Sequence, residues 1–274
     1  MKINKRWEIP WHIIFFIFIL VLLYPIFYAL GFSLKSLQDA YNSPLSIIPK
    51  NITFENFNQL FTSLPALKIT WNTFVIASVV TIFKIITSFL AAYAFVYFIF
   101  KGKNVIYFFL ISTIFLPFTI TMIPNYLIIS SLGLADSVWG VILPQLADAM
   151  GIFLLTQAMR SIPVSLIEVA RLDNMEHWRI MKDIVLPLVR PAVTSTSIWF
   201  FIMAWNEYVW PVLILKTVDN YTLPLALQMY ISSEGGTNFT VAMAVSVITM
   251  IIPLTLYLTF QKYIIGTFVS SGIK

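Results

Sequence analysis

Six long runs of apolar residues, separated by more polar segments, dominate the pattern along the chain. Each run is close to the roughly 20 residues that an α-helix needs to cross about 30 Å of membrane hydrocarbon. The runs cover residues 10–32, 71–100, 104–124, 138–159, 191–215 and 239–260. The pattern therefore predicts an all-α, polytopic membrane protein with six transmembrane helices.

The composition also favours a membrane environment. Of the 274 residues, 59% are hydrophobic and 11% are charged, whereas a soluble domain is about half apolar and a quarter charged. So few charged residues cannot cover a surface that faces water, which excludes a soluble globular protein. The sequence has no cysteine, and its two histidines lie in different segments, so we expect no metal site.

The basic residues give the orientation. The net charge is +5 at pH 7, and we attribute it to membrane topology and expect no nucleic-acid binding. With the N-terminus inside the cell, most of the 17 lysine and arginine residues fall in inside segments. The lysines that fall in outside segments are Lys35, Lys50, Lys68 and Lys216. We therefore expect both termini to be cytoplasmic.

We expect residues 1–274 to form one membrane domain, because no Gly/Ser linker or charge block divides the sequence. Two loops between the spans are long. An outer loop covers about residues 34–70, and a cytoplasmic loop covers about residues 160–190.

The cytoplasmic loop has internal order. Ser165 and Glu168 fit the S-x-x-E capping box, which predicts the start of a helix. Asn174 stands where a chain leaving a helix often adopts the left-handed conformation. We expect a second helix over about 176–185, stopped by Pro187 and Pro191 before the next span begins.

The same loop resembles the "EAA" loop of binding-protein-dependent ABC importer permeases. The family form is E-A-A, three residues, G, nine residues and I-x-L-P. The positions that match it are Glu168, Ala170, Ile184, Leu186 and Pro187. Val169 stands where the family has alanine, and Asn174 where it has glycine.

The resemblance implies the type I ABC importer permease fold, with the loop seated as coupling helices in a groove of a cytoplasmic ATPase. The coupling residues that it implies are Glu168, Val169, Ala170, Arg171, Asp173, Asn174, Leu186 and Pro187. The sequence has no G-x-x-x-x-G-K-[ST] motif, so ATP and Mg would be bound and ATP hydrolysed by a partner ATPase. We expect no cofactor and no catalytic residue in this chain. The alternative for this loop is an amphipathic hairpin lying on the lipid headgroups.

Trp205-Asn-Glu-Tyr-Val-Trp-Pro211 resembles the W-N-[DE]-x-x-W-P segment of carbohydrate-type permeases of this family, and Tyr221-Thr-Leu-Pro-Leu-Ala-Leu resembles their Y-T-L-P-L-x-L run. Aromatic faces together with carboxylate or amide groups commonly hold sugars. The candidates for the substrate pathway are therefore Trp205, Asn206, Glu207, Tyr208 and Trp210. They could instead form an interfacial aromatic belt, and Asn206 could satisfy backbone groups freed near Pro211.

Two ionisable residues lie near the middle of predicted spans, where a charge is costly unless it faces a polar interior. Lys84 and Asp148 could form an internal pair, either to orient helices or to serve transport. Pro117, Pro124 and Pro144 predict broken or kinked helices around a cavity.

The resemblance implies one transmembrane subunit of an ATP-driven importer for a carbohydrate or related polyol, in a bacterial-type cytoplasmic membrane. Its partners would be a second homologous permease subunit, two ABC ATPase subunits and an extracytoplasmic substrate-binding protein. The alternative is a self-contained secondary transporter or channel. That class predicts inverted repeats and several charged groups within the spans, and neither is evident in the sequence. The clustered residues that a membrane enzyme needs are also missing.

Overall fold

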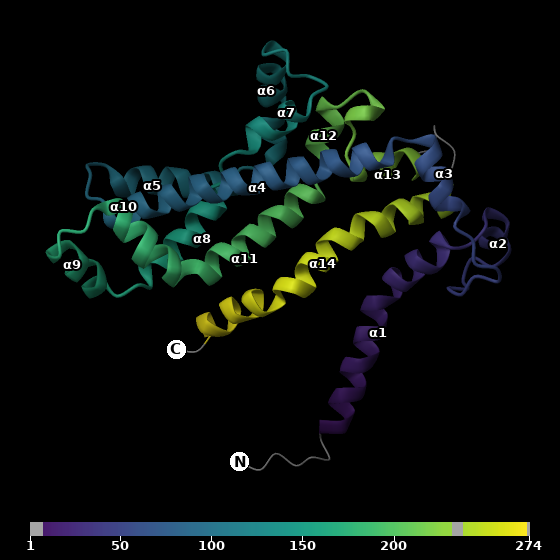
Figure 1. Cartoon of the computed structure of the whole chain (residues 1–274), viewed down its shortest axis with the longest axis horizontal. Coiled ribbons are helices and arrows are strands. Elements are labelled where there is room, and N and C mark those ends of the chain that lie inside the picture. The colour runs from purple at the N-terminus through teal and green to yellow at the C-terminus, as the bar shows by residue number, and fades with distance from the viewer. Residues whose placement is uncertain (1–7, 232–237, 273–274) are drawn as a thin grey trace. The chain divides into compact units, whose positions relative to one another are not determined.

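The computed structural model describes residues 8–231 and 238–272. Within these two stretches every regular element is helical, which confirms the all-α prediction (Figure 1). The chain divides into two compact units, and each combines two separate stretches of sequence. The first joins Met1–Leu67 to Leu223–Ile251, and the second joins Lys68–Thr222 to Ile252–Lys274.

The first unit contains the N-terminal span and most of the predicted outer loop. Its helices are α1 (Glu8–Ser33), α2 (Leu37–Asn42), α3 (Glu55–Ser63), α13 (Leu223–Ile231) and the first part of α14 (Phe239–Gly272). Most apolar side chains of α1 are exposed, with Phe16 62% and Val21 64% accessible. A helix that is apolar on all sides and so little buried within its own chain suits contact with lipid.

The predicted outer loop folds around a buried lysine. Lys35 is fully buried, and its ammonium group donates to the carbonyl oxygens of Ser43 at 2.8 Å and Ser46 at 2.5 Å. The Asn56 amide donates to the carbonyl oxygens of Ser33 and Lys35. These bonds satisfy polar groups that would be costly to bury alone, so the loop has a fixed structure.

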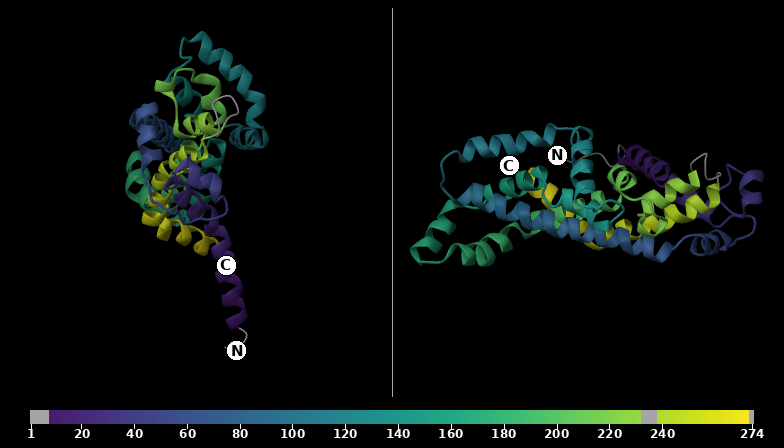
Figure 2. Two further views of the ribbon diagram at one scale, coloured as in Figure 1. Left: turned by 90° about the vertical axis from the view of Figure 1, so that its right-hand side faces the viewer. Right: turned by 90° about the horizontal axis from the view of Figure 1, so that it is seen from above.

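The second unit contains the remaining helices. They are α4 (Ala66–Tyr97), α5 (Lys103–Ser112), α6 (Phe118–Ser131), α7 (Val138–Ile142), α8 (Ala149–Arg160), α9 (Val164–Leu172), α10 (His177–Arg179), α11 (Leu186–Trp205) and α12 (Val209–Ile214). The π-helical segment Ile180–Val185 joins α10 to α11. The 3₁₀ turns are η2 (Thr113–Phe115), η3 (Leu143–Gln145) and η5 (Val218–Asn220). α4 runs along most of this unit in Figure 1 and in the right-hand view of Figure 2.

The helices confirm a polytopic membrane protein. Among the described residues, four segments are long and apolar enough to cross a membrane: Ile9–Ser33, Ala66–Tyr97, His177–Ile214 and Phe239–Lys262. Two further predicted spans are broken pairs, and counting each pair as one span gives up to six.

The breaks fall close to two of the prolines. Lys103–Phe115 and Phe118–Ser131 meet at 99° across Pro117, and Val138–Gln145 and Ala149–Arg160 meet at 44° just after Pro144. Proline lacks the N–H that would continue the ladder, and its ring clashes with the preceding turn. Pro124, in contrast, lies inside α6.

Candidate functional site

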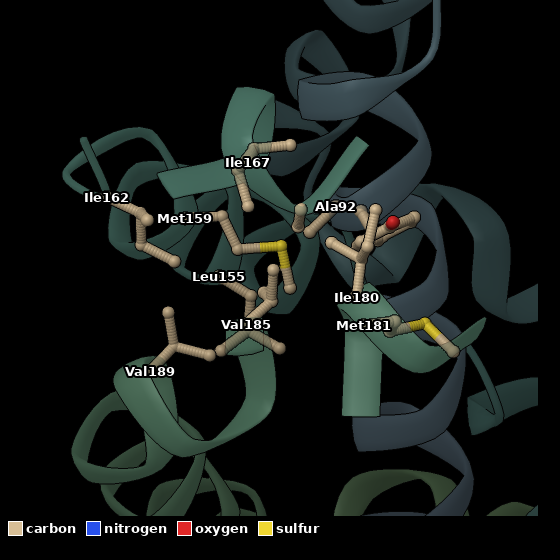
Figure 3. Close-up of a cluster of buried hydrophobic side chains, with 11 residues drawn as sticks. Ala92, Leu155, Met159, Ile162, Ile167, Ile180, Met181, Val185 and Val189 are labelled. Carbon is tan, nitrogen blue, oxygen red and sulfur yellow. The ribbon is translucent and has the colours of Figure 1, made fainter. Parts of the chain in front are cut away.

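The 160–190 loop is built on a cluster of buried apolar side chains (Figure 3). The cluster joins the end of α4 and the end of α8 to the loop and the start of α11. Its members include Ala92, Tyr93, Leu155, Met159, Ile162, Ile167, Ala170, Ile180, Met181, Val185 and Val189. Burying this much apolar surface fixes the loop to the ends of the long helices.

Helix α9 has two different faces. Ile167 and Ala170 are buried in the cluster. Glu168 is exposed, as are Val169 (57%) and Leu172 (80%). Ala170, one of the predicted coupling residues, is therefore directed into its own chain, whereas Glu168 and Val169 are free to meet a partner.

Asn174 forms the turn between α9 and α10. Its φ of 54° is left-handed, as predicted. The N–H of Met175 donates to the carbonyl oxygen of Ala170, and the N–H of Asn174 donates to that of Arg171, both at 3.0 Å. This is the Schellman pattern, which satisfies carbonyl groups left free at a helix end. Asparagine therefore supplies the turn for which the family pattern has glycine.

Two predictions about this loop are wrong. No capping box forms at Ser165 and Glu168, because α9 begins at Val164 after Pro163, with no side-chain cap. The prolines do not separate the second helix from the next span. α10 passes through the π-helical segment directly into α11, and the N–H of Leu186 donates to the carbonyl oxygen of Met181. The wider π turn shifts the hydrogen-bond register just before Pro187, where an α-helical ladder would need the missing N–H.

The remaining predicted coupling residues lie near the turn between α9 and α10 or near the start of α11. Arg171 donates from its guanidinium to the carbonyl oxygen of Tyr97 at 2.9 Å. Asp173 ends α9 and is exposed. Leu186 and Pro187 are exposed at the start of α11.

The structure brings Lys84 and Asp148 together at the break between α7 and α8. The Lys84 ammonium lies 3.1 Å from Asp148 Oδ2 and 5.1 Å from the centre of the Phe200 ring. Asp148 Oδ1 accepts from the N–H of Gly151 and so caps α8. One carboxylate therefore caps a helix and binds a cation on α4, which stabilises both charges at membrane depth.

The Trp205–Pro211 segment spans the break between α11 and α12. Trp205 and Trp210 are fully buried: Trp205 stacks on Phe201, and the Trp210 indole N–H donates to the carbonyl oxygen of Gly140. Both side chains are therefore packed in the interior of the chain, and neither exposes a ring face that a solute could contact in this conformation.

The polar residues of this segment are more accessible. Asn206 is exposed, and its side-chain amide donates to the carbonyl oxygen of Ile202 at 2.8 Å. Glu207 and Tyr208 are half-buried, and Glu207 Oε1 accepts from the N–H of Trp210. These three side chains are therefore more accessible than the two tryptophans.

Asp136 organises a polar cluster that the sequence did not reveal. Its carboxylate accepts from the N–H groups of Lys216 and Thr217 and from the Thr217 hydroxyl, and its backbone oxygen accepts from the Asn220 amide. We name Asp136, Lys216, Thr217 and Asn220 the Asp136 hub. Burial by itself raises the pKa of Asp136, but these hydrogen bonds outweigh it and lower the pKa to about 2.

The Asp136 hub is fastened to the beginning of α4. The Asn72 amide donates to the carbonyl oxygens of Asp219 and Tyr221 at 2.9 and 3.2 Å. The Lys68 ammonium lies 2.8 Å from Asp219 Oδ2. From Asn72 to Tyr93 the helix rises about 32 Å, so the hub and the 160–190 loop meet α4 about one membrane thickness apart.

Residues 7–267 match the family described as "Binding-protein-dependent transport system inner membrane component". The chain belongs to this family. The family suggested by the Glu168–Pro187 spacing is thus confirmed, and the match extends into the first 70 residues, where no motif was recognised.

This permease is similar to several curated proteins named as sn-glycerol-3-phosphate transport system permease protein UgpE. The one from Yersinia enterocolitica is 32% identical, with 98% of each chain covered. The one from Escherichia coli O6:K15:H31 is 31% identical, again with 98% coverage of both. The one from Brucella suis biovar 1 is 28% identical, with 93% coverage of both.

Two solved structures share the fold. One is a bacterial ABC transporter involved in the import of the acidic polysaccharide alginate, with a TM-score of 0.79, 25% identity and coverage of 96% of this permease and 98% of that chain. The other is the alginate transporter in complex with a periplasmic protein that holds an alginate pentasaccharide, with a TM-score of 0.68, 16% identity and 93% coverage of both. The permease is thus a multi-pass inner-membrane subunit of an ABC importer that works with a substrate-binding protein. None of these relatives is a self-contained secondary transporter or channel.

Proposed function

We propose that this chain forms half of the translocation pathway of an ATP-driven importer for a carbohydrate or related polyol. The 160–190 loop then couples it to cytoplasmic ATPase subunits. The observation that carries the proposal is the exposed face of α9, which bears the family motif and is held in place by the buried cluster beneath it.

The exposed face has the character of a protein interface. Its large apolar side chains, each accessible by 45% or more, are Val164, Leu166, Val169 and Leu172, and Trp178 of α10 is exposed as well. An apolar patch of this kind, next to the carboxylate of Glu168, favours a protein partner over solvent. Glu168 and Asp173 also argue against a helix lying on anionic lipid, which prefers a basic polar face.

The loop and both termini lie in the cytoplasm in this proposal, in one membrane domain. Two ABC ATPase subunits bind ATP and Mg there and hydrolyse the ATP. A second homologous permease supplies the other half of the pathway, because a chain with one coupling loop suits a two-fold arrangement. The extracytoplasmic substrate-binding protein delivers the solute from outside.

The substrate class rests on the relatives and on the Trp205–Pro211 segment. The names of the relatives refer to sn-glycerol-3-phosphate and to alginate, which are both rich in hydroxyl groups. Asn206, Glu207 and Tyr208 offer an amide, a carboxylate and a phenol at a helix break, and such groups hold hydroxylated solutes. The buried rings of Trp205 and Trp210 pack on either side of that break and stabilise its conformation.

A single introduced cysteine tests the coupling role, because the natural sequence has none. Glu168→Cys, modified with a short photoactivated crosslinker in native membranes, should join the permease to an ATPase subunit. Ser131→Cys, exposed at the end of α6, is the matched control and should not. Equal crosslinking from both positions, or none from Glu168→Cys, would contradict the proposal.

A further inference from the structure

Tyr93 is a buried tyrosine near the end of α4 that bonds to the 160–190 loop. Only 4% of it is exposed. Its hydroxyl donates to the carbonyl oxygen of His177 at 3.1 Å and lies 3.0 Å from Nδ1 of the same residue. The tyrosine hydroxyl has one proton. When it donates that proton to the carbonyl oxygen, the hydrogen of the second bond must belong to Nδ1. Two close polar contacts therefore join the two residues.

Two neighbouring contacts strengthen the same junction. The Phe98 ring meets the His177 ring edge-on, with centroids 4.6 Å apart. The Arg171 guanidinium donates to the carbonyl oxygen of Tyr97, the last residue of α4. Carbonyl groups at a helix C-terminus carry partial negative charge, so a cation is favourable there. Both α9 and α10 are thus bonded to the end of α4.

His177 is also the first residue of α10, which continues through the π-helical segment into α11. The Tyr93–His177 pair therefore joins α4 to the start of a second long helix. A force applied to the 160–190 loop acts at the point where the two helices meet.

We propose that Tyr93 and His177 form a latch that makes the 160–190 loop and the end of α4 move as one body when the ATPase subunits close. This rests on the coupling role proposed above. Tyr93 is a positioning residue, because it touches neither ATP nor solute. The buried cluster holds the loop against α4 by apolar burial, which is non-directional, and the hydrogen bonds of the pair add directional contacts that set its angle.

Tyr97 provides a matched control one turn further along α4. Its hydroxyl donates to the carbonyl oxygen of Met159 at 3.2 Å. That bond joins α4 to α8, and not to α9 or α10. Tyr97→Phe therefore removes the same chemical group from the same helix without touching the latch.

The test uses the permease assembled with its ATPase subunits in lipid nanodiscs. Spin labels on Ile99→Cys, two residues after α4 ends, and on Lys182→Cys, both exposed, report the separation of that end of α4 from the loop. The spin–spin coupling is measured without nucleotide and after trapping with ATP, Mg²⁺ and vanadate. With Tyr93 intact, the coupling should be the same in both states. In Tyr93→Phe, trapping should produce a weakly coupled population about fivefold larger than in Tyr97→Phe, the factor expected from one lost hydrogen bond.

Three results would overturn the latch: a coupling that changes on trapping with Tyr93 intact, an unchanged coupling in Tyr93→Phe, or equal loosening in both phenylalanine variants. His177→Ala, which keeps the backbone acceptor, is the second variant if Tyr93→Phe fails to assemble, and it should loosen the loop in the same direction. The Glu168→Cys crosslink separates the two proposals. If the crosslink to the ATPase forms but Tyr93→Phe has no effect, the latch alone fails.

Discussion

Two non-glycine residues of the second unit, Asn174 and Asp136, adopt the left-handed backbone conformation, and the chain holds them in opposite ways. Asn174 turns the 160–190 loop above a cluster of buried apolar side chains. Asp136 is held by hydrogen bonds to its own carboxylate and backbone. The end of α4 therefore packs against the apolar cluster beneath the 160–190 loop, whereas its beginning is bonded to the polar region around the Asp136 hub.

The difference shows what each end is suited for. An apolar cluster is non-directional, so it can hold the 160–190 loop firmly while leaving α9 an exposed face for a partner. In the Asp136 hub, the carboxylate of Asp136 accepts hydrogen bonds from the backbone N–H groups of Lys216 and Thr217. The stability of the hub therefore depends on that one carboxylate. The first region should tolerate changes on its exposed face, and the second should depend on a single side chain.

The largest effect should come from placing a charge in the apolar region. Ala170→Asp puts a carboxylate among buried apolar side chains and should destabilise the permease by at least about 3 kcal/mol. Thermal unfolding in detergent measures the loss. Val169→Asp, on the exposed face of the same helix, should unfold like the natural chain but copurify poorly with the ATPase. If both variants unfold alike, the two faces of α9 are not distinct.

The pair between the two regions should have the next largest effect. Lys84→Met leaves Asp148 without its cation and should cost about 2 kcal/mol, because the pair is largely but not fully buried. Lys84→Met combined with Asp148→Asn should cost less than either change alone, since no charge is left unpaired. Unfolding in detergent gives the stability, and solute uptake by the double variant shows whether the pair serves transport. Normal uptake would restrict it to holding helices together.

A smaller effect should follow removal of the hub carboxylate. Asp136→Ala removes the acceptor for Lys216 and Thr217 and places alanine in a left-handed conformation, which should cost about 1–2 kcal/mol. Asp136→Asn keeps an acceptor oxygen and tolerates the conformation, so it should cost less than half as much. Melting temperatures in the same detergent compare them. If Asp136→Ala and the natural chain have the same melting temperature, the Asp136 carboxylate does not stabilise the permease.

The smallest effect should be the pH dependence of the hub near neutrality. The pKa of Asp136 is lowered from 3.8 to about 2, so its stabilisation is present above about pH 4 and is lost as the pH falls toward 2. The difference in melting temperature between the natural chain and Asp136→Asn should be constant from about pH 5 to 8. A difference that changes within that range would mean that another group titrates with the hub.

The sequence predicted the long helices well because hydrophobic length is a strong signal. The runs at 10–32, 71–100 and 239–260 each correspond to one long helix. The runs at 104–124 and 138–159 do not, because the helices break near Pro117 and Pro144, and α6 continues to Ser131. Proline signals a break, but the angle depends on tertiary contacts that one sequence does not display.

The site was predictable in spacing but not in orientation. The left-handed turn predicted at Asn174 is present, and the polar residues Lys84 and Asp148 do meet. The sequence did not indicate that Ala170, Trp205 and Trp210 face inward, because burial depends on neighbouring helices. The Asp136 hub was missed because its partners lie about 80 residues away in sequence. The single usable signal was an aspartate, which tolerates the left-handed conformation, just before a short helix.

The π-helical segment at Ile180–Val185 has a consequence for every residue after it. A π turn accommodates one more residue than an α turn, and each residue advances an α-helix by about 100°. Deleting a single residue there would let the segment relax to α-helix with α11 kept in phase, whereas relaxation to α-helix with every residue kept would rotate the whole of α11 by that amount. The α11 side chains that are now buried would then face another direction. The π-helical segment beside the family motif therefore sets the rotation of the fifth span about its axis.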